Sequence, residues 1–254
     1  MEPQQMRLFF CLYLSMKVQL FIPCFMDQLY PQVAFNTIKV LERAGCEVMY
    51  NPNQTCCGQP AFNAGFWGES KDVCTKFVQD FEGADYIVSP SASCTGFVRN
   101  NYGKLFENNA FQSPAKKVKQ RMYELSEFLV QVLGITNLGA SFPAKITYHD
   151  SCAGLRECRI KEEPRKLLNA VEGIEIVEMA DVETCCGFGG SFAVKYDTIS
   201  TSMADQKIDH AIATNAEYIV STDTSCLMHL EGRINHHGQA IKVLHLADIL
   251  SAGY

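Results

Sequence analysis

A cysteine pair followed by glycine occurs twice in this chain, in QTCCGQPAFNAG at 54–65 and in ETCCGFGGSFAV at 183–194. The flanking sequence also repeats, since GADYIVSPSASC and NAEYIVSTDTSC follow the two pairs and both end at a cysteine. Matching cysteines are separated by offsets of 128, 129 and 132 positions, for Cys24 and Cys152, Cys57 and Cys186, and Cys94 and Cys226. Such similar offsets indicate an internal duplication, so both halves should adopt one fold.

Each copy alternates between β-rich and helical patterns. KVQLFIPCF at 17–25 and AKITYHDSC at 144–152 are β-rich, and amphipathic stretches bounded by proline and glycine follow at 30–45 and 162–173. Second short strands, CEVMYNP and IEIVEMA, lead into the cysteine pairs. This order predicts an α/β fold of two pseudo-repeated units with parallel sheets. The cysteines should then lie at the C-terminal ends of strands, where open parallel sheets bind ligands.

The repeat also predicts the domain boundaries. We expect an N-terminal extension at 1–15, a first CCG unit at 16–106, a connecting helical segment at 107–143 and a second CCG unit at 144–254. With these boundaries each unit contains one of the two cysteine pairs and the cysteines that match between the repeats.

Two more helices are expected outside the repeated core. In the connecting segment, Ser113 is the candidate N-cap and Pro114 the first helical residue. KVLHLADIL at 242–250 is predicted to be a helix that closes the chain.

The composition excludes several classes of protein. The net charge is −6 and only KKVK at 116–119 forms a basic run, so no nucleic-acid partner is expected. RLFFCLYLSM near the start falls short of the ~20 residues of a transmembrane helix and lacks the basic leader of a secretory signal. Twelve cysteines among long helical and strand patterns do not suit a small secreted disulfide scaffold. We therefore expect a cytoplasmic protein whose reduced thiols bind metal.

Each half contributes four cysteines to an expected metal site: the cysteine after its first strand, the adjacent pair, and the cysteine after its last strand. The two sets are Cys24, Cys56, Cys57 and Cys94, and Cys152, Cys185, Cys186 and Cys226. Four thiolates are a soft ligand set that suits an iron–sulfur cluster, with [4Fe-4S] foremost, or zinc. Zinc sites usually take cysteines from close C-x₂₋₄-C knuckles, whereas these ligands come from distant segments. Disulfides are not expected, because adjacent cysteines can hardly pair without strain.

The patterns C-x₃₁-CCG-x₃₅-C at 24–94 and C-x₃₂-CCG-x₃₈-C at 152–226 resemble the duplicated cysteine-rich CCG domain. That domain occurs in the cysteine-rich subunit of heterodisulfide reductase, in the iron–sulfur subunit of glycolate oxidase and in the L-lactate utilization protein A group. The phrases QTCCGQPAFNAG, HDSC, CCGFGGSFAVKYDTIS and SCLMHLEG are most similar to the last group. The glycolate oxidase subunit is less similar, because this chain lacks a ferredoxin-type C-x₂-C-x₂-C segment. The resemblance covers about residues 16–250.

The resemblance implies an iron–sulfur electron-transfer subunit of a cytoplasmic complex. That complex would oxidise L-lactate, or a related 2-hydroxy acid, to the 2-oxo acid, with a ferredoxin-like iron–sulfur partner subunit and a further subunit. A cluster transfers single electrons, whereas this oxidation removes two. GFGG at 187–190 lacks the G-x-G-x-x-G spacing of a dinucleotide site, so a partner or direct chemistry at the cluster is needed.

One position in each half departs from the resembled pattern. In the heterodisulfide reductase version each half ends in C-x-x-C, whereas this chain has Phe97 and His229 at the last position. Phenylalanine cannot bind metal and histidine can, so His229 is a candidate ligand. The number and type of clusters are left open by this difference.

Polar residues near the cysteines are candidates for further roles. Arg156 and Lys195 are the candidate carboxylate-binding residues, and His149 and Asp150 could hydrogen-bond cluster ligands. The glycines after each pair either bring backbone amides close to the cluster or form ordinary turns. Four cysteines without a repeat counterpart are expected to be non-ligands, with Cys158 the most plausible exception: Cys11, Cys46, Cys74 and Cys158.

Two other functions fit the same cysteines. In the first, zinc fastens the halves of a non-redox protein that binds partners through its surface. In the second, the adjacent cysteines act as a thiol–disulfide reductase of the heterodisulfide reductase type. A coloured iron-containing protein would exclude the first, and activity that depends on metal would exclude the second.

Overall fold

Two parallel sheets of four strands form the framework of the protein. The computed structural model describes residues 15–253, so residues 1–14 of the expected extension, including Cys11, lie outside the described residues. The first sheet has the order β2-β1-β3-β4 and the second has the order β6-β5-β7-β8, with all strand pairs parallel. Numbered from the start of its own half, each sheet therefore has its strands in the order second, first, third, fourth. The predicted fold of two pseudo-repeated α/β units is therefore confirmed.

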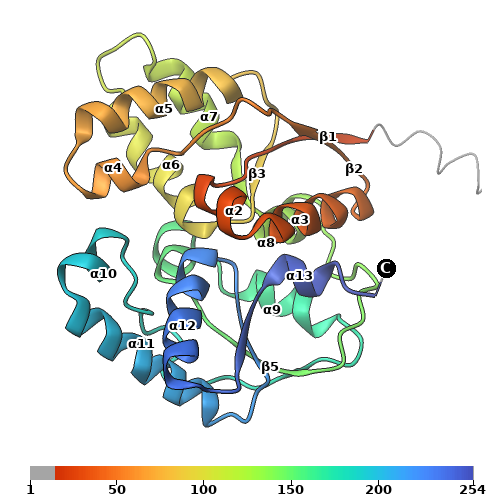
Figure 1. Ribbon diagram of the computed structural model, residues 1–254. Coiled ribbons are helices and arrows are strands. Elements are labelled where there is room, and N and C mark those ends of the chain that lie inside the picture. The colour runs from red at the N-terminus through yellow and green to blue at the C-terminus, as the bar shows by residue number, and fades with distance from the viewer. Residues whose placement is uncertain (1–14, 254) are drawn as a thin grey trace, which may run out of the picture.

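The elements of the first half alternate between strands and helices (Figure 1). They are β1 (Met16–Leu20), α2 (Cys24–Leu29), α3 (Pro31–Arg43), β2 (Cys46–Tyr50), α4 (Gln59–Asn63), α5 (Trp67–Phe81), β3 (Ile87–Ser89), α6 (Ala92–Leu105), α7 (Gln112–Arg121), β4 (Met122–Glu124), α8 (Leu125–Glu127) and the π-helical η1 (Phe128–Val132).

The second half follows a similar order, with a π-helical turn and a helix between its first two strands and a single helix between its last two. Its elements are β5 (Lys145–Tyr148), the π-helical η2 (Ala153–Cys158), α9 (Glu162–Asn169), β6 (Glu175–Ile176), α10 (Ser191–Lys195), α11 (Asp197–Ile212), β7 (Tyr218–Ser221), α12 (Thr224–His237), β8 (Lys242–His245) and α13 (Leu246–Leu250).

Three predictions at the ends of elements are wrong. Helix α7 begins at Gln112, so Ser113 and Pro114 lie within its first turn instead of at the N-cap and first position. The turn that leads into α7 is made earlier, because the side chain of Asn109 accepts from the backbone N–H of Phe111 at 2.8 Å.

The other two errors concern the last strand of each sheet. Residues 122–124 in the expected helical connection form β4, and residues 242–245 in the expected closing helix form β8. Each strand pairs in parallel with its neighbour, β3 or β7, and a helical turn follows at once. Such short strands contain too few residues to show the alternating pattern by which a strand is recognised in a sequence. Their conformation is decided by pairing with the neighbouring strand.

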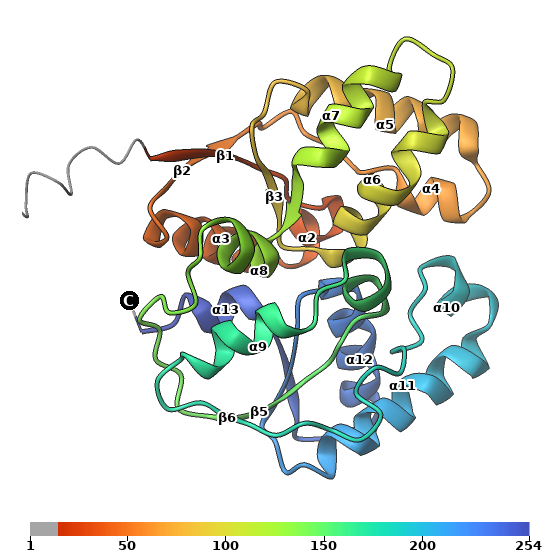
Figure 2. The same cartoon turned by 180° about the vertical axis from the view of Figure 1, so that it is seen from behind.

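The two halves share one apolar core. Buried side chains from both sheets meet there, including Leu20 of β1, Phe128 of η1, Ile146 of β5 and Leu246 of α13. In both views the helices α3, α8, α9 and α13 lie between the sheets (Figures 1 and 2). Burial of this shared surface holds the two cysteine-bearing halves in a fixed relation.

Among the described residues, no helix has the length and apolar character needed to cross a membrane.

Candidate metal centres

The four cysteines of the first half come from three segments that each follow a strand. Cys24 begins α2 after β1, the pair Cys56 and Cys57 follows β2, and Cys94 lies in the first turn of α6 after β3. Parallel strands end at the same edge of a sheet, so the topology brings these segments together. The placement agrees with the expected position of the site.

The sulfurs of the first half form a chain of contacts. The thiol of Cys24 interacts with that of Cys56, and the thiol of Cys56 with that of Cys57. The chain ends at Cys94, whose Sγ lies 3.3 Å from Sγ of Cys57. Cys57 and Cys94 are buried, Cys56 is half-buried and Cys24 is exposed. One side of the site is therefore buried, and the other side, which we call its rim, is open to solvent.

The second half builds the same chain with its own cysteines. The thiol of Cys152 interacts with that of Cys185, Cys185 with Cys186, and Cys186 with Cys226. Cys186 and Cys226 are buried, and the other two are half-buried. The four predicted cysteines of each half thus lie along one chain of neighbouring sulfurs, and only Cys186 and Cys226, with His149, form a group of three candidate ligands within 4.8 Å among the described residues.

Glycine is required after both cysteine pairs. Gly58 and Gly187 have φ values of +90° and +91°, a region that side chains disfavour. A Cβ on Gly58 would lie 2.6 Å from Sγ of Cys74, and one on Gly187 would overlap the carbonyl oxygen of Ser200. The N–H groups of both glycines also point at a site sulfur, each 3.4 Å from Sγ of Cys56 or Cys185. Both glycines therefore form tight turns whose N–H groups contact a cysteine sulfur.

The crowding of sulfurs changes their acidity. Hydrogen bonds from the thiols of Cys152 and Cys186 lower the pKa of Cys185, and the hydrogen bond with Cys185 raises the pKa of Cys152. Neighbouring sulfurs in this arrangement compete for protons, so they cannot all be thiolates unless a cation neutralises them. Converging, partly buried thiols of this kind fit a metal or iron–sulfur group.

The two centres differ in the residue that follows the first strand. The backbone N–H of Phe21 donates to Val88 O at 2.9 Å, and that of His149 donates to Val220 O at 2.8 Å. Phe21 and His149 therefore occupy equivalent positions in the two sheets. Phe21 packs edge-on against Phe77 at 4.8 Å between ring centroids, so this side of the first centre is apolar.

A buried lysine in the second half occupies the position equivalent to Phe77. Ser70 and Ser200 make equivalent hydrogen bonds to Gly58 O and Gly187 O, which aligns α5 with α11 and Phe77 with Lys207. Lys207 is 1% exposed and its Nζ donates to Asp181 O at 2.8 Å and Val182 O at 2.7 Å. Through these two hydrogen bonds Lys207 holds the loop that precedes Cys185 in place. No sequence motif indicated this role.

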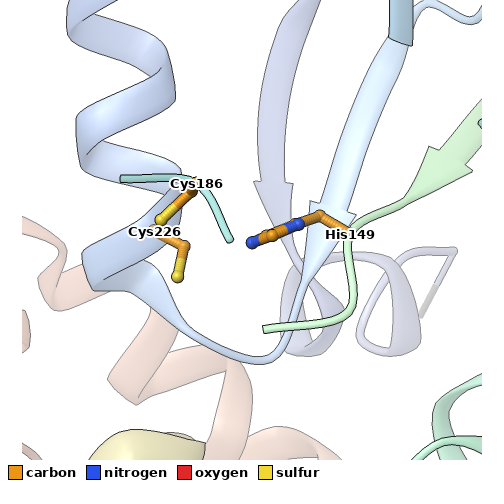
Figure 3. Close-up of side chains that lie close together, drawn as sticks. All are labelled: His149, Cys186 and Cys226. Carbon is orange, nitrogen blue, oxygen red and sulfur yellow. The ribbon is translucent and has the colours of Figure 1, made fainter. Parts of the chain in front are cut away.

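His149 is fully buried and its ring points toward Cys186 and Cys226 (Figure 3). Its nearest donor atom and the sulfurs of the two cysteines all lie within 4.8 Å of one another. Neither ring nitrogen has a hydrogen-bond partner among the described residues. Burial, followed by the positive charge of Lys207, lowers the pKa of His149 to about 3 and keeps the ring neutral. A neutral imidazole can bind a metal through nitrogen.

His229, the other candidate nitrogen ligand, has partners of its own. Its Nε2 lies 3.1 Å from Oγ of Ser200 and 3.4 Å from the carbonyl oxygen of the same residue. Its ring lies 6.0 Å from that of Phe188. Alignment of the repeats identifies the position of His229, but the direction of its side chain is visible only in the structure.

The two candidate carboxylate-binding residues lie in different places. Arg156 is exposed and lines an open cavity of about 720 Å³ beside the half-buried Cys185. Asp181 and Glu183 contribute acidic side chains to the same cavity. Lys195 is exposed on α10 and is not among the residues that line it. The geometry thus favours Arg156 over Lys195.

The described cysteines without a repeat counterpart lie in the core or donate hydrogen bonds to backbone carbonyl oxygens. Cys46 is buried in the shared core. Cys74 donates to the carbonyl oxygen of Cys57 at 3.3 Å, and Cys158 donates to that of Ala92 at 3.2 Å. Cys74 therefore supports the loop of the first cysteine pair from behind.

Comparison with known proteins agrees with the duplicated sites. Residues 18–99 and 146–231 each match the model of the CCG cysteine-rich domain. A protein named Lactate utilization protein A from Oceanobacillus iheyensis is 42% identical over 237 residues, which are 93% of this chain and 97% of that protein. One of the same name from Exiguobacterium sp. is 44% identical over 239 residues, with 93% and 97% covered.

A solved structure supports the fold at a greater distance. A hypothetical protein from Helicobacter pylori aligns with a TM-score of 0.58 at 13% identity, over 94% of this chain and 49% of that chain. The resemblance read from the cysteine motifs is confirmed by the sequence matches. The chain belongs to the family of cysteine-rich CCG-domain proteins, carries two copies of the domain, and is related along most of its length to proteins named lactate utilization protein A.

Proposed function

We propose that this protein is an iron–sulfur electron-transfer subunit of a cytoplasmic complex that oxidises L-lactate or a related 2-hydroxy acid to the 2-oxo acid. The observation that carries the proposal is the placement of four cysteines after equivalent strands in each half, with Sγ of Cys57 and Cys94 3.3 Å apart in the first and Cys186 and Cys226 within 4.8 Å in the second. Relatives named for lactate utilization suggest the substrate class. All cysteines in the described part of the chain are free thiols, which suits a reducing compartment.

The electron balance of the reaction requires partners. Oxidation of a 2-hydroxy acid to a 2-oxo acid releases two electrons and two protons, whereas an iron–sulfur group accepts one electron at a time. We expect a ferredoxin-like iron–sulfur partner subunit to receive these electrons and a further subunit to complete the complex. The half-buried rim of each centre, with Cys56 or Cys185 at its edge, is the expected point of electron exchange.

The cavity beside Cys185 is the candidate place for the acid itself. Its single arginine, Arg156, offers a charge-assisted hydrogen bond to a carboxylate. Arg156 lies on η2, and η2 begins directly after Cys152. A bound acid would therefore lie next to the cysteines of the second half. The chain's own groups would thus bind and orient the substrate close to the electron acceptor.

The test is the metal content of protein purified without oxygen. We expect iron and acid-labile sulfide in a ratio near one, with absorption near 400 nm that bleaches on reduction. The variant Cys185→Ser/Cys186→Ser should lose the iron of the second centre, whereas Cys46→Ala, in the apolar core, should keep it. Addition of L-lactate to the complex with its partner subunits should then bleach the same absorption.

Zinc in the second half is the alternative that a specific observation favours. His149, Cys186 and Cys226 can supply three of the four ligands of a tetrahedral mixed nitrogen and sulfur site. Stoichiometric zinc without iron or sulfide, even after anaerobic reconstitution, would replace the electron-transfer proposal with a structural metal site.

A further inference from the structure

We infer that His149 is a direct nitrogen ligand of the metal group in the second half, so that the two halves hold chemically different metal centres. The inference deepens the proposed function, on which it rests for the identity of the metal group. Its evidence is the position, burial and missing partners of one side chain.

The first step is the cost of leaving His149 without a partner. The residue is 0% exposed, and both of its ring nitrogens lack a hydrogen-bond partner among the described residues. A buried polar group without a partner lowers the stability of the folded protein. A bound metal would accept the lone pair of one ring nitrogen and so remove the part of this cost that belongs to that nitrogen.

The second step is distance. The donor atoms of His149, Cys186 and Cys226 lie within 4.8 Å of one another. Ligands of one tetrahedral metal ion, at metal–sulfur and metal–nitrogen distances of about 2.3 and 2.0–2.1 Å, are separated by roughly 3.6–3.8 Å, and ligands of different irons in one cluster lie further apart. Only small side-chain movements separate the arrangement in the structure from a bound one. Figure 3 shows the imidazole approaching the sulfurs from the sheet, opposite the helix that bears Cys226.

The third step is the contrast with the first half. Phe21 fills the position equivalent to His149, and all six histidines of the chain lie between residues 149 and 245. The first half therefore offers its centre no histidine nitrogen, whereas the second half offers both sulfur and nitrogen. The duplication has produced two similar cages with different chemistry.

The remaining histidines do not offer the same geometry. They contact other groups or lie at the surface: His210 contacts Ala180 O, His229 contacts Ser200, His237 contacts Asp205 and Arg233, His245 contacts Pro90 and Ala247, and His236 is exposed. His245 is the only other buried histidine in the described chain, and both of its ring nitrogens have partners.

The experiment measures nitrogen coupling to the reduced, paramagnetic iron–sulfur group by pulsed electron paramagnetic resonance. Full-length protein is reconstituted anaerobically with iron and sulfide, with and without ¹⁵N-labelled histidine. We expect the strong coupling of a directly bound nitrogen, which changes with the label. It should be lost in His149→Phe, which introduces the residue of the first half, and kept in the control His229→Gln.

Three results would overturn the inference. The first is a cluster with no strong histidine coupling in the wild-type protein, and the second is loss of the coupling in His229→Gln. The third is a coupling that persists in a folded His149→Phe protein. If that variant does not fold, the labelled wild-type protein and His229→Gln still decide the matter.

Failure of the proposed function gives a different pattern. If no iron is incorporated, binding of Co²⁺ is measured instead by its visible absorption. At least tenfold weaker binding in His149→Phe than in His229→Gln would support the nitrogen ligand while excluding the iron–sulfur proposal. Equal binding by the two variants would overturn the inference as well.

Discussion

The backbone N–H of Ser93, in the first half, donates to the buried carboxylate of Asp223, in the second half, at 2.9 Å. The hydroxyl of Ser93 approaches the same carboxylate at 3.3 Å. Ser93 directly precedes Cys94, and Asp223 lies at the N-terminus of α12, three residues before Cys226. One carboxylate therefore connects the two helix starts that carry the last cysteine of each centre. It also caps α12, since it accepts from the backbone N–H of Ser225 at 3.3 Å and from the hydroxyl of the same residue at 2.7 Å.

Replacement of Asp223 by alanine should destabilise both the helix and the joint between the halves. Loss of the cap costs about 0.5–2 kcal/mol, and loss of hydrogen bonds to a buried charged group adds about 1.5–3 kcal/mol. Ser91→Ala is the matched control, because Ser91 caps α6 at the equivalent position and its contacts with Ser93 and Cys94 stay within the first half. Urea unfolding should show a larger loss for Asp223→Ala than for Ser91→Ala. Equal losses would mean that the contact with Ser93 contributes nothing.

Alanine at Gly187 should damage the second centre more than alanine at an open glycine. Gly65 has the same φ of +91°, but a Cβ there meets nothing within 4 Å. Gly65→Ala should therefore cost only the backbone term, about 1–2 kcal/mol. Gly187→Ala adds overlap with Ser200 O, which costs about 1–3 kcal/mol more, and shifts the N–H that points at Cys185. We expect a lower urea midpoint and less bound metal per chain for Gly187→Ala, and normal metal content for Gly65→Ala.

The cysteine sets and the parallel sheets could be predicted because the duplication tests each assignment twice. A cysteine after a strand in one copy has a counterpart after a strand in the other, as with Cys94 and Cys226. Strands β4 and β8 could not be predicted from local pattern. They are three and four residues long, and their conformation depends on pairing with β3 and β7, which lie far away in the sequence.

Differences between the copies contained information that motif matching did not use. The aligned pairs Phe21 with His149 and Phe77 with Lys207 replace apolar residues by ionisable ones beside the second centre. Position-by-position comparison of the halves would have found both pairs. The direction of a side chain is a different matter, since His149 faces the cysteines and the ring nitrogen of His229 contacts Ser200. Backbone geometry and packing decide that direction, and neither is visible in a motif.

The buried Glu124 should make stability depend on pH. Burial raises the pKa of Glu124 to about 7, against the opposing effect of hydrogen bonds from Ser126 and Glu127. Since the folded pKa lies above the ordinary 4.5, the folded protein holds a proton that the unfolded chain releases between about pH 4.5 and 7. The stability that the protonated Glu124 contributes to the folded protein is therefore fully present below pH 4.5 and is lost as the pH rises to 7.

The variant Glu124→Gln isolates this contribution because its side chain stays neutral. A shift of this size corresponds to about 3 kcal/mol between pH 4.5 and 8, as an order of magnitude. Relative to the wild-type protein, the variant should gain stability as pH rises from 5 to 8. Urea midpoints at pH 5, 6, 7 and 8 measure the difference. A constant difference between the two proteins across this range would contradict the prediction.

Arg156 should control the affinity for the acid without controlling the chemical step. If the guanidinium binds the carboxylate in the cavity beside Cys185, Arg156→Gln removes a charge-assisted contact worth about 1.5–3 kcal/mol. KM for the 2-hydroxy acid should then rise about tenfold to a hundredfold, with kcat changed much less, because that contact is equal in ground and transition states. Lys195→Gln is the control, since Lys195 is exposed and does not line the cavity. The measurement is lactate-dependent reduction of an acceptor dye by the assembled complex. An unchanged KM in Arg156→Gln would exclude the cavity as the carboxylate site and move substrate binding to a partner subunit.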